Sequence, residues 1–258
     1  MRIVIKIGTS TLTHSTGWLN IRRVEKLCRV VSDLKNAGHE IVLVSSGAIG
    51  MGVGKLSLKE RPKDIPTKQA AAAVGQCELM YTYDKLFSEH HHTVAQILLT
   101  ASDFSCDERK ENFHNTLSRL LDLSVIPVIN ENDSVATDEI VIGDNDTLAA
   151  MIALSAQADL LIILSDIDGL YTADPRVSPD ARLIETVYEI DDGIMSLAGD
   201  KGSELSTGGM ITKLRAASIA SEAGTDTVIA NGEDPEVLYD IAEGKKIGTR
   251  FVSKVKRS

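Results

Sequence analysis

Aromatic residues, positive charge and long apolar runs are all scarce in this chain of 258 residues. Aromatic side chains make up 4% of the sequence, which leaves few platforms on which unpaired bases could stack. The formal net charge of -10 would repel a phosphate backbone. These shortages exclude nucleic acid as an expected partner.

Cysteine is also rare, at three residues, Cys28, Cys77 and Cys106. Their odd number and wide spacing fit neither a disulfide framework nor a zinc site, so we expect reduced thiols in a cytoplasmic protein. The apolar run before Lys6 is short and no cleavage site follows it. Runs such as residues 160–164 are far too short to cross a bilayer, so no membrane partner is expected.

Lysine and arginine are absent between Arg119 and Arg176, where acidic residues recur. A run of like charge is usually a solvated face. Several of these acids, however, flank apolar segments where exposure is limited, and a metal ion or a substrate ammonium group would relieve them. With 43% hydrophobic residues, the chain can bury a large core.

Apolar runs typical of buried strands alternate with segments of helical periodicity. This alternation predicts an α/β fold, with a largely parallel sheet covered on both faces. The expected strands are residues 2–7, 40–44, 93–99, 125–129, 160–164 and 227–230. The expected helices are residues 21–34, 69–87, 111–123, 147–158 and 209–223.

Polar or glycine-rich segments follow three of these strands directly, after Val44, Ile129 and Leu164. In parallel sheets, ligands bind at the carboxyl ends of the strands. The sequence therefore predicts that these three segments meet at one edge of the sheet and form a site there.

The first segment, residues 45–52, is glycine-rich but matches neither a Walker A motif nor the dinucleotide fingerprint. A tight strand-to-helix turn would explain Gly47, Gly50 and Gly52 equally well. The hydroxyl groups of Ser45 and Ser46, placed at the strand end just before the glycines, favour a ligand site.

Two lysines lie beside glycine-bearing turns near opposite ends of the chain. Lys6 ends a buried strand, where an unpaired lysine is rare, although it could instead extend its ammonium group to solvent. Lys213 lies in the first turns of a predicted helix, where a cation is unfavourable unless an anion is bound, although it could simply face water. Backbone N–H groups and an ammonium group at such turns can surround a phosphate.

Two Asx-rich segments, residues 130–133 and 143–146, bracket a predicted hairpin at residues 139–142. Either segment alone would be an ordinary turn or helix cap. Their pairing at the carboxyl edge of the sheet favours a binding site. Residues 165–166 and 169–176 form a third polar segment, which could also be a plain surface loop.

Taken together, these segments resemble the motifs of the amino acid kinase family, in the same order and over almost the whole chain. The segments that carry the resemblance are residues 6–10, 44–52, 130–137, 143–146, 169–176 and 207–213. The resemblance implies a three-layer αβα sandwich and a kinase that uses ATP with Mg2+. It is strongest to members that phosphorylate the side-chain carboxylate of L-glutamate to L-glutamyl 5-phosphate, the first step of proline biosynthesis.

The resemblance also implies roles for individual residues. Lys6 and Lys213 would hold the ATP phosphates, Asp146 would orient both lysines, and the metal ligands stay open. The residues expected to bind L-glutamate are Ser46, Gly47, Asp133 and Asn145. The residues expected to bind ATP are Lys6, Gly8, Ser165, Asp166, Thr207, Gly208, Gly209, Met210, Ile211, Thr212 and Lys213.

The family pattern further implies one kinase domain over residues 1–258, with an acceptor-binding lobe at about 1–165 and a nucleotide-binding lobe at about 166–258. Many members carry an additional RNA-binding-like module called PUA, which we do not expect here. The pair Ser165-Asp166 stands where Thr-Asp is common, and it keeps the hydroxyl group. Feedback inhibition by L-proline and assembly into a homodimer or tetramer are also implied.

Other functions compete with this one. On the same fold the acceptor could be acetylglutamate, aspartate, carbamate or a nucleoside monophosphate, although a nucleotide would require arginines that the region between Arg119 and Arg176 lacks. A non-catalytic amino-acid sensor is a second alternative, but both lysines are present. A dinucleotide-binding oxidoreductase is disfavoured because the glycine fingerprint fails.

Overall fold

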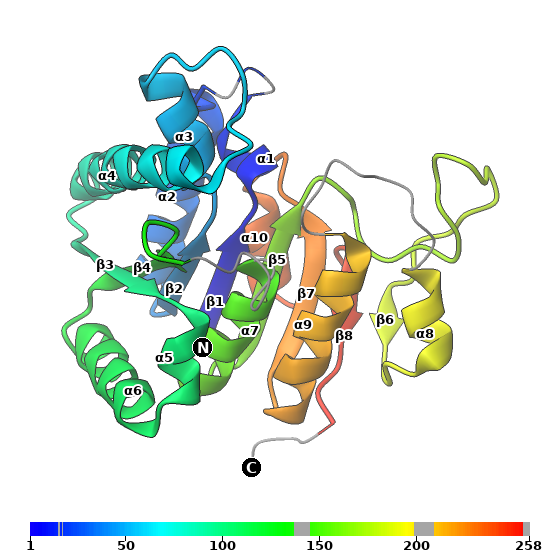
Figure 1. Ribbon diagram of the computed structural model, residues 1–258. Helices are drawn as coiled ribbons and strands as arrows, with labels where there is room; N and C mark the ends of the chain where they lie inside the picture. Colours follow the sequence, from blue (N-terminus) through cyan, green and yellow to red (C-terminus); the bar gives the residue numbers. More distant parts are fainter. Residues whose placement is uncertain (15, 17, 137–144, 199–208, 255–258) are drawn as a thin grey trace.

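A computed structural model describes residues 1–14, 16, 18–136, 145–198 and 209–254 (Figure 1). The strands within the described residues are β1 (Arg2–Ile7), β2 (Glu40–Ser45), β3 (Val94–Leu99), β4 (Ile126–Glu131), β5 (Leu160–Ser165), β6 (Thr186–Val187), β7 (Asp226–Asn231) and β8 (Thr249–Phe251). The helices within the described residues are α1 (Thr9–Leu12), α2 (Ile21–Asn36), α3 (Ala48–Lys55), α4 (Ile65–Ser88), α5 (Ala101–Ser105), α6 (Asp107–Asp122), α7 (Asn145–Ser155), α8 (Asp192–Leu197), α9 (Met210–Glu222) and α10 (Val237–Ala242).

The described strands form a single sheet in the order β3-β4-β2-β1-β5-β7-β8-β6. Neighbouring strands are parallel except β7 and β8, which are antiparallel. In the central pairs, Lys6 of β1 lies opposite Val44 of β2 and Ile163 of β5. The carboxyl ends of β1, β2, β4 and β5 therefore meet at one edge, as the sequence predicted.

Side chains of β1 alternate between the two faces of the sheet, as the pleat requires. Ile3, Ile5 and Ile7 enter the core cluster that contains α2, α4 and α10, whereas Val4 enters the cluster that contains α6, α7 and α9. Helices therefore cover both faces, and the predicted three-layer αβα sandwich is confirmed (Figure 1). The same alternation turns Lys6 toward the face covered by α7 and α9.

Helix α3 was not expected, because its sequence is rich in glycine, which disfavours helices. A Cβ on Gly52 would lie 1.8 Å from the carbonyl oxygen of Ala71, and one on Gly75 would lie 1.7 Å from that of Ala48. The glycines therefore let α3 and α4 pack backbone against backbone. Segment 45–52 is thus a short turn around Gly47 followed by a helix, and Gly52 lets this helix approach α4 closely.

The thiols of Cys28, Cys77 and Cys106 are free, and Cys28 is buried. None of the described helices combines the length and the apolar character that crossing a membrane requires.

Candidate active site

The sheet has a topological switch point between its central strands, β1 and β5. Helix α2, which follows β1, packs on one face, and α9, which follows β5, packs on the other. Chains that leave neighbouring strands toward opposite faces open a crevice at the carboxyl edge, where ligands of α/β proteins bind. Lys6 lies near the end of β1 and Ser165 ends β5, so both lie at the carboxyl edge beside this switch point.

A buried cluster of Lys6, Asp146 and Lys213 lies at this edge. The Nζ atom of Lys6 lies 2.6 Å from Oδ1 of Asp146, and Nζ of Lys213 donates to Oδ2 at 3.0 Å. Lys6 is 7% exposed, Lys213 is 4% exposed and Asp146 is fully buried. The structure thus joins two residues that are more than two hundred positions apart in the sequence through one carboxylate.

The neighbouring lysines lower the pKa of the Asp146 carboxyl group. Burial alone would raise the pKa of its carboxyl group, but the ammonium groups of Lys6 and Lys213 outweigh burial and hold that pKa below its ordinary value of 3.8. Asp146 also lies in the first turn of α7, where the helix dipole favours an anion. Two cations and one anion leave these three side chains with a net charge of +1, which suits an anionic ligand.

Helix α9 brings two donors to the same carboxylate. The hydroxyl of Thr212 lies 3.0 Å from Oδ2 of Asp146 and 2.7 Å from the carbonyl oxygen of Gly209, and its single hydrogen can be donated to either acceptor. Gly209 is the N-cap of α9 and contributes no side chain to cap it. A lysine in the first turns of a helix is unfavourable unless an anion lies near it. For Lys213, the carboxylate of Asp146 is such an anion.

A second polar group lies beside the cluster and contains Ser46 and Asn145. The Nδ2 atom of Asn145 donates to Oγ of Ser46 at 2.8 Å and to Oδ1 of Asn130 at 3.0 Å. Asn145 directly precedes Asp146 at the start of α7, so the two groups are adjacent. Gly47 follows Ser46 with φ +98°, a left-handed conformation that other residues rarely adopt, and it sharpens the turn into α3.

The chain leaves β1 close to both groups. The backbone N–H of Ser46 donates to the carbonyl oxygen of Ile7 at 3.1 Å, which fixes the turn after β2 to the end of β1. At Gly8 a Cβ would lie 3.3 Å from the carbonyl oxygen of Leu164 and 3.9 Å from Nζ of Lys6. Glycine at this position therefore leaves space next to the Lys6 ammonium group.

The other expected site residues lie on the same edge or outside the described residues. Ser165 is buried at the end of β5, and its hydroxyl donates to Oδ1 of the exposed Asp166 at 3.1 Å. Asp133 is half-buried in the turn after β4. Met210 and Ile211 open α9 and are half-buried. The residues that lie outside the described part are Gly143, Asp144, Thr207 and Gly208, together with the predicted hairpin at residues 139–142.

Sequence reasoning missed two residues of α4 that contact this region. Gln76 accepts a hydrogen bond from Asn130, and the hydroxyl of Tyr83 lies 2.9 Å from that of Ser45. Both are buried. A signal for them was available in the sequence. Both are polar, they are seven residues apart, and the other buried positions of this helix are mainly alanine, leucine and glycine.

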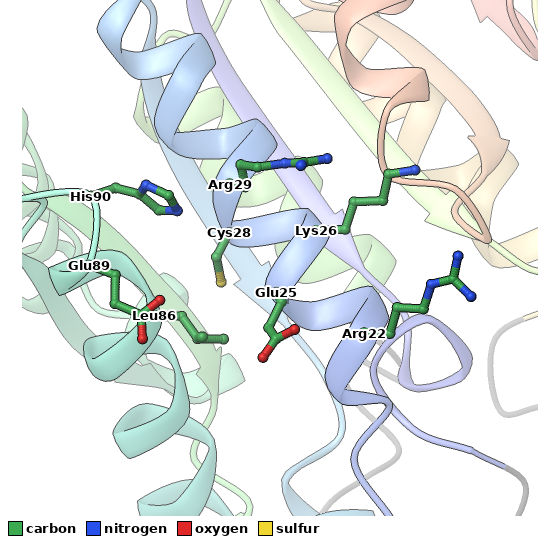
Figure 2. A pocket seen from close by; sticks show the side chains of 8 residues that line it. All are labelled: Arg22, Glu25, Lys26, Cys28, Arg29, Leu86, Glu89 and His90. Carbon is green, nitrogen blue, oxygen red and sulfur yellow. The ribbon is translucent and has the colours of Figure 1, made fainter.

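A surface pocket of about 570 Å³ lies elsewhere, between α2 and the end of α4 (Figure 2). Its lining includes Lys26 and Arg29 of α2, and Glu89 of the α4 C-cap. Both cations also pair with the loop after β7: Lys26 lies 2.9 Å from Asp234, and both contact Glu236. No residue expected to bind substrate or ATP lines this pocket, so we do not assign it to the active site.

The fold and the lysine–aspartate cluster place this chain in one class of protein. The model of the amino acid kinase family matches residues 1–231, and the chain belongs to that family. Among solved structures, carbamate kinase from Giardia lamblia bound to AMP-PNP has a TM-score of 0.68 at 16% identity, over 98% of each chain. UMP kinase from Bacillus anthracis has a TM-score of 0.67 at 13% identity, over 98% of this chain and 96% of that one.

Two relatives of known name are much more similar in sequence than these solved structures. A glutamate 5-kinase of Clostridium perfringens is 53% identical over 257 residues, which cover 98% of this chain and 96% of that enzyme. A glutamate 5-kinase of Caldanaerobacter subterraneus is 55% identical over 252 residues, which cover 98% of this chain and 68% of that enzyme.

Proposed function

We propose that this chain is a kinase that transfers the γ-phosphoryl group of ATP to the side-chain carboxylate of L-glutamate. The product is L-glutamyl 5-phosphate, and the reaction is the first step of proline biosynthesis. Membership of the amino acid kinase family and 53–55% identity to glutamate 5-kinases support this acceptor. The observation that carries the chemistry is the buried cluster of two lysines around Asp146, with its excess positive charge at the carboxyl edge of the sheet.

The chemistry asks for positioning and charge neutralisation more than for proton transfer. A glutamate side chain has a pKa of about 4.3, so its carboxylate is ionised at neutral pH and can attack phosphorus without a general base. Negative charge on the transferring group is spread over its oxygens, and fixed cations stabilise it. In this mechanism Lys6 and Lys213 contact the ATP phosphates, and Asp146 holds both ammonium groups toward them.

The acceptor and the nucleotide approach from opposite sides of β1 in this proposal. Ser46, Asp133 and Asn145 hold L-glutamate on the side of β2 and β4, where an acid can meet its ammonium group. Ser165, Asp166 and the segment 207–213 line the nucleotide site on the side of β5. We accordingly propose residues 1–165 as the acceptor lobe and residues 166–258 as the nucleotide lobe.

Mg2+ is part of the proposal because it accompanies ATP. Within the described residues there is no group of three or more histidine, cysteine, aspartate or glutamate side chains that could hold a metal ion. This fits Mg2+, which is usually bound by substrate phosphates with only one or two protein carboxylates. When bound, it would neutralise phosphate charge beside the two lysines, and Asp166 is an exposed carboxylate at the nucleotide side.

The test measures ADP release from ATP and Mg2+ with glutamate, acetylglutamate, aspartate, carbamate or UMP as acceptor, with hydroxylamine to trap an acyl phosphate as its hydroxamate. We expect ADP release that depends on glutamate, with matching hydroxamate. ADP release with another acceptor would show that the protein is a kinase but that its substrate is not glutamate. A folded protein that binds ATP and turns over no acceptor would instead support an amino-acid sensor.

The proposal also includes inhibition by L-proline and assembly into a homodimer or tetramer. Inhibition by L-proline is tested by adding it to the same assay, and a dimer or tetramer by light scattering. A cytoplasmic location is included because ATP and reducing conditions for three free thiols coexist there.

A further inference from the structure

Polar residues recur on one face of α4 at a spacing of seven, which is close to two helical turns. They are Gln69, Gln76 and Tyr83. The amide of Gln69 donates to the carbonyl oxygen of Ala136 at 3.2 Å, and the hydroxyl of Tyr83 lies 2.9 Å from that of Ser45. The outer two residues thus contact the segments that follow β4 and end β2, on both sides of the expected acceptor residues.

Gln76, the middle residue, joins a line of side-chain amides that ends at Ser46. Its Oε1 accepts a hydrogen bond from Nδ2 of Asn130 at 2.9 Å. Oδ1 of Asn130 accepts from Nδ2 of Asn145 at 3.0 Å, and the same Nδ2 donates to Ser46 at 2.8 Å. Gln76 and Asn130 are both buried, at 7% and 2% exposed, so solvent does not replace these bonds.

This line fixes which way each amide faces. An asparagine side chain can exchange the places of its oxygen and its NH2 group by turning over. If Asn130 turned over, its oxygen would face Oε1 of Gln76 and its NH2 group would face that of Asn145, so two acceptors and two donors would oppose each other. At the other end of the line, Nδ2 of Asn145 also lies 3.4 Å from the carbonyl oxygen of Ser45, which can only accept, so this contact directs the NH2 group of Asn145 toward residues 45 and 46. Gln76 supplies the acceptor for the NH2 group of Asn130 in the matching orientation, and so keeps Oδ1 of Asn130 against Asn145.

The side chain of Gln76 has one polar atom that is hydrogen-bonded and one that is not. Within the described residues, Nε2 of Gln76 is buried and lacks a hydrogen-bond partner. A buried donor without a partner lowers the stability of a fold. A methionine of similar length would fill the same space and remove this donor, but it would leave the buried NH2 group of Asn130 without its acceptor. The atom of Gln76 that takes part in the line of amides is therefore the oxygen that Asn130 contacts.

We propose that Gln76 is a positioning residue for the acceptor, which acts through Asn130 to fix the amide of Asn145 against Ser46. The inference rests on the proposed function, in which Asn145 and Ser46 hold L-glutamate. It adds a residue from α4 that does not itself touch the substrate.

The first test is the steady-state kinetics of Gln76→Met, measured against glutamate and against ATP. Because Asn130 then loses the acceptor of its NH2 group and no longer holds Asn145 firmly in place, we expect the KM for glutamate to rise by about tenfold or more, since misplaced contacts weaken acceptor binding strongly. The KM for ATP should stay within about twofold, because the hydrogen bond of Gln76 goes to Asn130, on the acceptor side. The matched control is Thr227→Val, which also removes a buried side-chain polar atom without a partner in the described residues, at the amino end of β7.

The second test separates positioning from packing by a double-mutant cycle with Asn145→Ala. If Gln76 acts through Asn145, adding Gln76→Met to Asn145→Ala should change the KM for glutamate by less than about twofold. Full additivity, or an unchanged KM in the single variant, would overturn the inference. So would an equal loss against both substrates with a lowered Tm, because that pattern indicates a structural role.

A crystal structure of Gln76→Met tests the geometry whatever the acceptor is. We expect the side chains of Asn130 and Asn145 to shift, so that the contact between Asn145 and Ser46 lengthens or is lost. If wild-type protein does not phosphorylate glutamate, the proposed function fails, and this structure alone decides the inference. A wild-type arrangement of Asn145 and Asn130 in the variant would overturn it.

Discussion

Replacing Asp146 by asparagine should separate the stability of the lysine cluster from its catalytic role. The substitution keeps the size of the side chain but removes the negative charge that the Lys6 and Lys213 ammonium groups share at 2.6 and 3.0 Å. Removing one partner of a buried ion pair costs about 3–5 kcal/mol, because the remaining charge stays desolvated. Two lysines would remain here, so we expect the free energy of unfolding to fall by at least about 3 kcal/mol.

Replacing a lysine of the cluster should affect stability less than replacing Asp146, but it removes positive charge from the site. In Lys213→Met, one buried lysine–aspartate pair remains, and the cluster becomes neutral. The substitution removes one partner of a buried pair, but Asp146 keeps Lys6 as its counter-ion, so no buried charge of the cluster loses its counter-charge. We therefore expect Lys213→Met to remain at least about 2 kcal/mol more stable than Asp146→Asn, although its site has lost the excess positive charge.

The assay is urea unfolding followed by far-UV circular dichroism, with the slopes compared to check that two-state behaviour is kept. Fluorescence would report poorly, because the single tryptophan, Trp18, is 60% exposed. The control is Asp234→Asn, which removes an aspartate that pairs with Lys26 at 2.9 Å on the surface, where ion pairs contribute little. If Asp146→Asn were as stable as this control variant, the reasoning about the buried cluster would be refuted.

Three further predictions follow from the same contacts. Lys6→Ala and Lys213→Ala should each fold but lose turnover by at least about a hundredfold, since each removes a cation from the transferring phosphoryl group; near-normal turnover in both would contradict the mechanism. Because the pKa of Asp146 lies below 3.8, its contribution to stability is complete above that pH and is lost as the pH falls through the lower folded value. The difference in unfolding free energy between wild type and Asp146→Asn should therefore shrink in acid, and a constant difference down to pH 2 would exclude this origin. Gly75→Ala should lower stability by about 1–3 kcal/mol and raise the KM for glutamate, because its methyl group would meet the backbone of α3 at Ala48. Gly50→Ala, whose Cβ would lie 3.8 Å from Thr9, serves as the control that should not be destabilised.

The central strands and helices were predictable because each buries an apolar pattern long enough to recognise. The short strands β8 and β6, which follow β7 in the sheet, were not, since they have three and two residues and carry no periodicity. Helix α3 was missed because a close approach of two backbones, rather than local propensity, makes its glycines favourable. Lys6 stood out because lysine seldom ends a buried strand, whereas Gln76 did not, because its importance depends on Asn130, which is distant in sequence.

The position of β1 at the centre of the sheet explains why the lysines at residues 6 and 213 meet. The chain first adds β2, β4 and β3 on one side of β1, and then returns through α7 to place β5 and β7 on the other side. Residues that follow the first set of strands can therefore approach one substrate, and residues that follow the second set can approach another, while Lys6 borders both. Since kinases named for carbamate and for UMP share this fold, the sheet itself does not select the acceptor. Under the proposed function, selection must come from side chains on the β2–β4 side, and α4 contacts that side at Ser45, Asn130 and Ala136.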